Sequence, residues 1–326
     1  MIGAAFDFGQ IRVDPGTRHE LELRPARLPS GGWMAMPVVV VNGAAVGPTV
    51  WLSAALHGDE INGVEIIRRV LELVPPATLA GTVLAVPVVN IPGFATADRY
   101  MPDRRDLNRC FPGSARGSLA SRFAHLFMTE IVERCSFGLD LHTGSDHRCN
   151  LPQIRADLDD PATRELAAVF GAPVAVHSRT RDGSLREAAV RRGIRTLLYE
   201  GGEAWRFDDH AIEVGVTGTL RVLAHLGMID DVALAAPSPT RPRLLRSSRW
   251  LRSPMSGLAR IRVQLGDVVQ AEQTVAVVGD AIGAHPRFVR AREPALVIAR
   301  SEFPVVHQGD ALVHLAPLGD RIRSNQ

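Results

Sequence analysis

The sequence contains no lysine, because all 37 basic residues of the 326-residue chain are arginine. This absence excludes a lysine Schiff base and any lysine-attached biotin or lipoyl group. Cysteine is also scarce. The three cysteines (Cys110, Cys135 and Cys149) are widely spaced and form no C-x-x-C pair, which argues against a disulfide framework and against a cysteine-rich zinc site.

Long apolar runs and a charge excess are missing as well. The longest apolar runs, at residues 36–41 and 83–89, are far too short to span a bilayer. No basic flank precedes an apolar segment near the start, so we expect no signal peptide and a cytoplasmic location. The formal net charge is only +2 and arginines are interspersed with acids, so neither a nucleic acid nor a membrane is an expected partner.

Apolar runs that predict strands alternate with segments of helical periodicity between residues 37 and 226. Strands are expected at 37–43, 49–56, 82–90, 137–144, 173–177 and 194–202, and helices at 60–74, 118–135, 161–170, 184–192 and 208–226. This alternation predicts an α/β fold with helices on both faces of a sheet. A long loop is expected at 91–117, and loops of that length in a compact domain are usually functional or disordered.

The composition changes after about residue 232. Residues 233–248 are rich in proline, serine and arginine and are expected to form a linker. Residues 249–326 contain short β-like runs and Gly-Asp turns, with no segment of helical periodicity, and predict a small all-β domain. The expected division is a large domain at 1–232, a linker at 233–248 and the all-β domain at 249–326.

The segment HGDEING suggests part of a metal site. His57 and Glu60 are three residues apart where a predicted strand ends and a helix begins. A catalytic zinc ion needs three protein ligands and one open position, and two histidines with a glutamate are a known set. The segment DLHTG supplies His142 at the carboxyl end of another strand, where α/β sheets place their sites. Asp140 is either a partner of that histidine or an ordinary strand-end acid, and Asp59 is expected as a helix N-cap.

Metal-assisted amide hydrolysis also needs a base for the attacking water. Glu200 ends a further predicted strand and is followed by two glycines that would let a substrate approach. It is either an exposed edge residue or a catalytic group, and the other strand-end residues favour the second. In the long loop, Arg99, Asn108 and Arg109 offer planar donors suited to an oxyanion and a carboxylate.

The segments HGDEINGV, RY, DLNRCFPG, DLHTG and YEGG stand in the order seen in the succinylglutamate desuccinylase/aspartoacylase family, which this sequence resembles over roughly residues 37–230. The family belongs with the zinc carboxypeptidase-like hydrolases. The resemblance implies an α/β/α sandwich with a mixed sheet and one Zn²⁺ per chain, held by His57, Glu60 and His142. It also implies Glu200 as the general acid/base.

The same resemblance implies roles for four more residues. Arg99 would polarise the scissile carbonyl, while Asn108 and Arg109 would bind a substrate carboxylate. Arg186, in GSLREAA, looks similar to a further substrate arginine of the family. The aspartoacylase branch uses a tyrosine of its C-terminal domain to recognise the substrate's acidic group. Here no tyrosine follows Tyr199, which argues against N-acetylaspartate itself.

The C-terminal segment resembles a biotinyl/lipoyl-type barrel-sandwich domain. A carrier domain presents a lysine at a hairpin tip, whereas the corresponding residues 279–283 include none. An acyl- or carboxyl-carrier function is therefore excluded. The domain is expected to act by shape: to cover one side of the zinc cleft, to restrict substrate size, or to contact another subunit in a homo-oligomer. A tethered module without a role in catalysis is the alternative.

The favoured function is a zinc-dependent amidohydrolase that removes the acyl group from an N-acylated amino acid or similar small molecule carrying a carboxylate. A zinc carboxypeptidase or an esterase could use the same residues, since the motifs do not separate amide from ester. A non-catalytic binding protein on this fold is a further alternative. The complete set of His57, Glu60, His142 and Glu200 argues against it.

Overall fold

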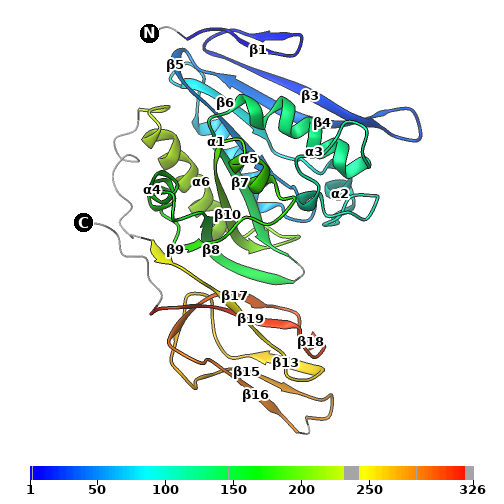
Figure 1. The fold of residues 1–326 in the computed structure, drawn as a ribbon, viewed down its shortest axis with the longest axis vertical. Coiled ribbons are helices and arrows are strands. Elements are labelled where there is room, and N and C mark those ends of the chain that lie inside the picture. Colours follow the sequence, from blue (N-terminus) through cyan, green and yellow to red (C-terminus); the bar gives the residue numbers. More distant parts are fainter. Residues whose placement is uncertain (2, 146, 231–241, 284, 320–326) are drawn as a thin grey trace.

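The computed structural model describes the whole chain except residues 2, 146, 231–241, 284 and 320–326 (Figure 1). A 13-stranded mixed sheet forms its centre. Its strands before residue 204 are β3 (Thr17–Arg27), β4 (Trp33–Asn42), β5 (Ala45–Ala54), β6 (Ala80–Val86), β7 (Phe137–Gly144), β8 (Arg148–Ala156), β9 (Val174–His177) and β10 (Arg195–Glu203). They lie in the order β8-β10-β7-β5-β6-β4-β3, and β9 pairs with β8. The four strands β10, β7, β5 and β6 are parallel to one another, so their carboxyl ends meet at one edge.

Helices cover both faces of this sheet. They are α1 (Asn62–Leu73), α2 (Ile91–Thr96), α3 (Leu119–Glu130), α4 (Pro161–Phe170), α5 (Leu185–Val190) and α6 (Asp209–His225), with short 3₁₀ helices η1 (Leu107–Arg109) and η2 (Val132–Arg134). Alternate valines of β4 show the division: Val39 and Val41 pack with α1, α4 and α6, whereas Val38 and Val40 pack with α3 and α5. The predicted α/β sandwich with a mixed sheet is confirmed.

The predicted elements differ from the observed ones in four places. The expected loop at 91–117 contains α2 and η1, and the expected helix at 118–135 ends as α3 at Glu130 before η2. The strand β8 (Arg148–Ala156) was not predicted. The first 35 residues, which gave no clear pattern, form β3 and a hairpin of β1 (Phe6–Phe8) and β2 (Ile11–Val13).

Some of the C-terminal strands extend the main sheet, and the others form a second, smaller sheet. They are β11 (Arg243–Leu245), β12 (Arg249–Arg252), β13 (Gly257–Ile261), β14 (Val268–Val269), β15 (Thr274–Gly279), β16 (Arg287–Arg290), β17 (Ala295–Ser301), β18 (Val305–Val306) and β19 (Ala311–Pro317). A small antiparallel sheet contains β16, β15, β13 and β18, while β17 pairs directly with β8 and β19 pairs with β17 (Figure 1). The main sheet therefore continues into the C-terminal region.

Part of the predicted linker is ordered structure. Residues 233–241 lie outside the described residues, but β11 occupies the end of the expected linker and pairs in parallel with β9. The predicted domain limits at 232 and 249 stay predictions. Within the described part of the chain, no helix has the length and apolar character needed to cross a membrane.

Candidate metal centre

Two neighbouring strands bring three potential metal ligands together. His57 and Glu60 lie in the turn between β5 and α1, and His142 lies near the carboxyl end of β7. Because β5 and β7 are parallel and adjacent, with Ala54 beside Leu141, the turn after β5 lies over the end of β7. The exposed fractions of His57, Glu60 and His142 are 4%, 2% and 4%, so the cluster is shielded from bulk water.

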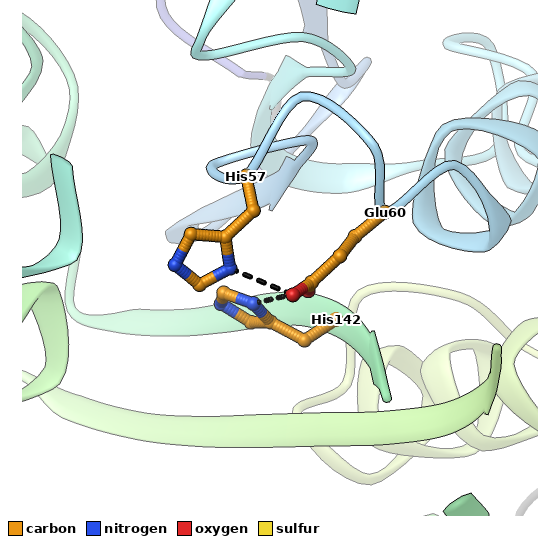
Figure 2. Close-up of side chains that lie close together, drawn as sticks. All are labelled: His57, Glu60 and His142. Atoms are coloured by element: carbon orange, nitrogen blue, oxygen red, sulfur yellow. Dashed lines mark hydrogen bonds and ion pairs between the residues drawn. The ribbon is translucent and has the colours of Figure 1, made fainter. Parts of the chain in front are cut away.

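The three side chains converge on one point (Figure 2). Nδ1 of His57 and Nδ1 of His142 each lie 2.8 Å from an oxygen of Glu60. One ligand atom from each residue lies within 4.8 Å of the other two. The contact between Nδ1 of His57 and Glu60 lacks hydrogen-bond geometry, so this buried nitrogen forms no hydrogen bond with a described group. A buried imidazole nitrogen that forms no hydrogen bond, next to a carboxylate and a second imidazole, fits a metal ion.

Further carboxylates orient the two imidazoles. Nε2 of His142 lies 2.8 Å from Oδ2 of Asp140, whose Oδ1 accepts a hydrogen bond from Ser53. Nε2 of His57 lies 3.2 Å from Oδ1 of Asp106. These contacts turn both Nδ1 atoms toward Glu60, as expected for histidines that bind a metal. Asp140 is therefore a partner of His142 and not an ordinary acid at the end of a strand.

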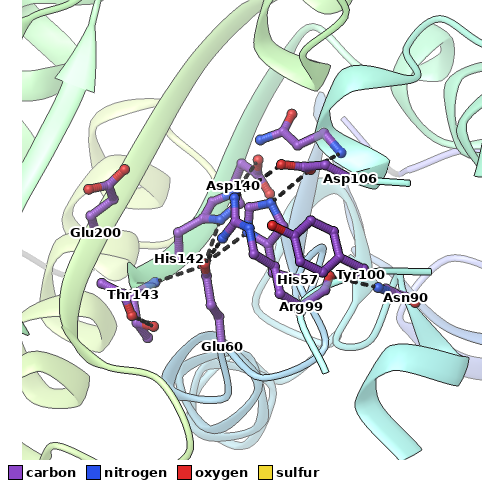
Figure 3. A network of polar contacts seen from close by, with 12 residues as sticks. His57, Glu60, Asn90, Arg99, Tyr100, Asp106, Asp140, His142, Thr143 and Glu200 are labelled. Atoms are coloured by element: carbon purple, nitrogen blue, oxygen red, sulfur yellow. Dashed lines mark hydrogen bonds and ion pairs between the residues drawn. The ribbon is translucent and has the colours of Figure 1, made fainter. Parts of the chain in front are cut away.

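Arg99 completes the network on the side of Glu60 (Figure 3). Its Nη1 donates to Glu60 Oε1 at 2.9 Å and its Nη2 donates to Asp106 Oδ2 at 3.2 Å. The backbone N–H of Thr143 donates to Glu60 Oε2. Burial alone would raise the pKa of Glu60, but His57 and His142 hold this pKa well below its usual value. Glu60 is therefore a carboxylate, the form that binds a metal.

Asp59 does not cap α1, so that expectation is wrong. The helix begins at Asn62 after Ile61, without a side-chain cap. Asp59 is instead 1% exposed, and neither of its oxygens has a hydrogen-bond partner among the described groups. Burial, together with the neighbouring Glu60, raises the pKa of Asp59 to about 6.

Glu200 lies beside the cluster without contacting it (Figure 3). Its Cα is paired with that of His142 on the parallel strands β10 and β7. Its Oε2 accepts hydrogen bonds from Asn150 at 2.8 Å and from Arg155 at 3.4 Å. The following glycines serve packing, because a Cβ on Gly202 would lie 2.5 Å from the Asn62 amide. The expectation that they leave room for a substrate is not supported.

One cleft collects all the predicted site residues. It is lined by His57, Glu60, Arg99, Asn108, Arg109, His142, Arg186 and Glu200. Two of these side chains are partly committed to the fold: Asn108 Oδ1 accepts from the N–H of Leu185, and Arg186 donates to the carbonyls of Ser178 and Arg179. Burial, with Arg155 nearby, lowers the pKa of Arg186 to about 10.

The structure adds residues that the sequence did not reveal. Arg148, Asn150 and Arg155 line the cleft from β8, and Trp250 and His314 line it from the C-terminal strands β12 and β19. Asp106, which contacts both His57 and Arg99, was also missed. Its place at the start of the DLNR segment is the one sequence signal that could have revealed a site residue of this kind. The C-terminal region therefore contributes to the cleft wall, as expected from one of its predicted roles.

Residues 46–226 match the sequence model of the succinylglutamate desuccinylase/aspartoacylase catalytic domain. The chain belongs to this family. It is 29% identical to the N-alpha-acetyl-L-2,4-diaminobutyric acid deacetylase of Halomonas elongata, over 97% of this chain and 94% of that protein.

Solved structures of similar proteins share the fold over nearly the whole chain. A succinylglutamate desuccinylase/aspartoacylase from Rhodobacter sphaeroides has a TM-score of 0.84 at 27% identity, covering 97% of this chain and 98% of the other. The ectoine utilization protein EutE (DoeB) from Ruegeria pomeroyi, in a product-bound structure, has a TM-score of 0.84 at 23% identity, covering 97% and 99%. The strands after residue 242 are thus part of an architecture found in these relatives.

Proposed function

We propose that this protein is a zinc-dependent hydrolase that cleaves the amide bond of an N-acylated amino acid, or a similar small molecule, that carries a carboxylate. The observation that carries the proposal is the buried His57–Glu60–His142 cluster, whose ligand atoms converge, in the same cleft as the separately held carboxylate of Glu200. Two imidazoles and one carboxylate are a ligand set of catalytic zinc sites.

The metal would be held by Nδ1 of His57, Nδ1 of His142 and the carboxylate of Glu60. Zinc bound there supplies Lewis-acid polarisation of a carbonyl and lowers the pKa of water toward neutrality. Asp106 and Asp140 hold the two imidazoles in the orientation that this requires. Arg99 contacts Glu60. We assign to Arg99 the stabilisation of the negative charge that develops on the scissile carbonyl oxygen.

Glu200 is assigned to proton transfer. It lies next to His142 in the sheet and lines the cleft, but it makes no contact with the ligand atoms within hydrogen-bond distance. A reacting water and the scissile amide would occupy the space between them. Glu200 would take a proton from the water and deliver it to the leaving nitrogen. Asn150 and Arg155 hold its carboxylate in place for both transfers.

Asn108 and Arg109 are assigned to a carboxylate of the substrate. Both line the cleft. The oxygen of the Asn108 amide is used by Leu185, whereas its Nδ2 donates to no described residue. The Arg109 guanidinium has no ion-pair partner among the described carboxylates and donates only to the carbonyl of Asn108. A guanidinium with free donors suits two carboxylate oxygens.

The relative from Halomonas elongata supports the class of reaction, since its name describes deacetylation of an N-acetylated amino acid. We infer the same class here, with an acyl group such as acetyl or succinyl. An activity screen of the zinc-loaded protein against paired amide and ester substrates would test it. Release of a free amine from N-acyl amino acids, abolished by a chelator and restored by zinc, is the expected result.

The other outcomes of the screen favour other functions. Release of the carboxyl-terminal residue from peptides, in place of removal of an N-acyl group, would favour a carboxypeptidase. Cleavage of the matched esters without cleavage of the amides would favour an esterase. A zinc-loaded protein that binds the compounds without turnover would favour a binding protein on this fold.

A further inference from the structure

Trp205 lies in the turn that follows β10 and has a strained backbone. Its φ is +64°, a conformation that bulky side chains rarely adopt. Residues in such conformations persist where the surrounding structure holds them, and they gather at active sites. The side chain is 39% exposed and does not line the cleft that contains the proposed metal site. The strained conformation is therefore held by contacts of Trp205 with neighbouring segments.

Two hydrogen bonds of Trp205 join the segments that bring Glu60 and Arg99 together. Its backbone N–H donates to the carbonyl of Asp59 at 2.9 Å, and Asp59 directly precedes Glu60. Its indole Nε1 donates to the carbonyl of Ala97 at 3.0 Å, two residues before Arg99. Trp205 is therefore bonded to both segments that form the ion pair of Arg99 with Glu60.

The segment before Arg99 needs such a contact at its end. The helix α2 packs tightly on the turn after β5, because a Cβ on Gly58 would lie 2.0 Å from the carbonyl carbon of Gly93. The helix then ends, and Ala97 follows in the left-handed conformation with φ +51°. The N–H of Ala97 bonds back into α2. The indole of Trp205 thus supplies a contact from outside the segment, at the point where the chain turns toward Arg99.

Contacts between aromatic rings hold the indole in place. The rings of Trp205 and His147 have centroids 4.8 Å apart, and the rings of His147 and Phe303 have centroids 5.1 Å apart. Ring pairs at such separations stabilise one another. His147 lies in the turn between β7 and β8, and Phe303 lies in the loop between β17 and β18. The C-terminal strands therefore contact, through His147, the residue that holds the segment of Arg99.

We propose that Trp205 is a positioning residue, which holds the segment of Arg99 where this guanidinium bonds to Glu60 beside the metal site. Trp205 acts through Arg99 and does not touch the substrate. The inference rests on the proposed function, because it uses the role assigned there to Arg99. A donor that meets negative charge only as the charge develops contributes to kcat and little to KM. Loss of the Trp205 contact should therefore lower kcat.

The kinetic test uses Trp205→Phe, which removes the indole N–H and keeps an aromatic ring. In the zinc-loaded protein, kcat on an N-acyl amino acid that the wild type cleaves should fall by about two- to ten-fold, as the loss of one hydrogen bond gives, with KM unchanged. His147→Asn removes the stacked ring at a position with φ +57°, which asparagine tolerates, and should also lower kcat. Phe207→Leu, at an exposed ring two positions after Trp205, is the control and should match the wild type.

A double-mutant cycle shows whether the effect passes through Arg99. In an Arg99→Ala background, Trp205→Phe should change kcat by less than about two-fold, because residues that act as a unit are not additive. The same loss of kcat in both backgrounds would mean a purely structural role of the indole and would overturn the inference. Wild-type kcat in both Trp205→Phe and His147→Asn would overturn it as well. So would a higher KM at unchanged kcat, since that result would mean contact with the substrate.

Hydrogen exchange tests the contact without turnover. Trp205→Phe should speed amide exchange in the peptide that covers residues 94–101, which contains the bonded N–H groups of Ala97 and Asp98. Exchange in α4 should stay at the wild-type rate, and Phe207→Leu should change neither region. Unchanged exchange at 94–101 in Trp205→Phe would overturn the inference. Faster exchange there in a protein that cleaves no N-acyl amino acid would contradict the proposed function and confirm that Trp205 holds this segment.

Discussion

Glu200 and His142 occupy paired positions on the adjacent parallel strands β10 and β7, but their side chains belong to different networks. His142 contacts Glu60 and Asp140, whereas Glu200 is held by Asn150 and Arg155. The sheet therefore places a proposed ligand and the proposed base next to each other without a direct bond. Metal binding and proton transfer are expected to be separable by mutation.

The first prediction concerns the metal. His142→Ala removes one of two imidazole ligands and leaves a site with one nitrogen and one carboxylate donor, too few for a stable zinc site. Metal analysis after dialysis should show about one zinc per chain for the wild type and almost none for the variant. His210→Ala, at an exposed histidine of α6, is the matched control. Zinc retained by His142→Ala would remove this residue from the ligand set.

The second prediction concerns Glu200. Glu200→Gln keeps the size of the side chain but cannot accept a proton from water. A positioned general base contributes about 10²–10⁴-fold, so turnover should fall by that factor while zinc content stays at the wild-type value. Glu213→Gln, at a helix position whose side chain is 70% exposed, should behave like the wild type. Near-normal turnover of a zinc-loaded Glu200→Gln protein would contradict the assignment.

Asp106 gives the third prediction. Asp106→Asn keeps an oxygen that can accept from the backbone N–H of Asn108 but removes the negative charge beside His57 and Arg99. Loss of such an outer partner typically costs about 10–100-fold in metal affinity. Competition with a chelator should show this loss, and Asp98→Asn in the same loop should show none. An unchanged zinc affinity would mean that Asp106 only caps η1.

A fourth prediction separates binding of a carboxylate from structure. Arg109→Ala should reduce kcat/KM on substrates with a free carboxylate by an amount equivalent to about 1.5–3 kcal/mol, the contribution of a charge-assisted contact. On the matching primary amides the loss should be much smaller. The amides serve as the internal control, because a structural defect would reduce both activities equally.

Much of the site could be predicted because its parts are local in the sequence. An apolar strand precedes His57 and Glu60, and two further apolar strands contain His142 and Glu200 near their carboxyl ends. The carboxyl ends of parallel strands meet at one edge of the sheet. The carboxylate partner of His142 was also in reach, because Asp140 is two residues away on the same face of β7.

The rest of the cleft wall could not be predicted, because no local pattern in the sequence indicates it. The strand β8 has Pro152 in its interior and polar residues at Arg148, Asn150 and Arg155, a pattern that argues against a buried strand. Those side chains are polar because they face the cleft. His314 lies in an apolar run that predicts an ordinary core position. The three-dimensional structure shows that the C-terminal strands reach the site, because β17 pairs with β8 and His314 lines the cleft.

The last prediction tests the role of the C-terminal strands in the cleft. Deleting residues 247–326 would remove β17 from β8 and expose a strand edge, so a substitution is the sharper test. Trp250→Ala keeps the pairing of β12 with β19 but removes the ring that stacks on His314. We expect unchanged zinc content and a KM higher by roughly three- to ten-fold, since an aromatic stack contributes about 0.5–1.5 kcal/mol. Trp33→Ala is the control, because Trp33 also lies against an arginine, Arg27, but is 43% exposed and outside the cleft. Wild-type kinetics and an unchanged substrate range in Trp250→Ala would mean that these strands cover the cleft without contacting the substrate.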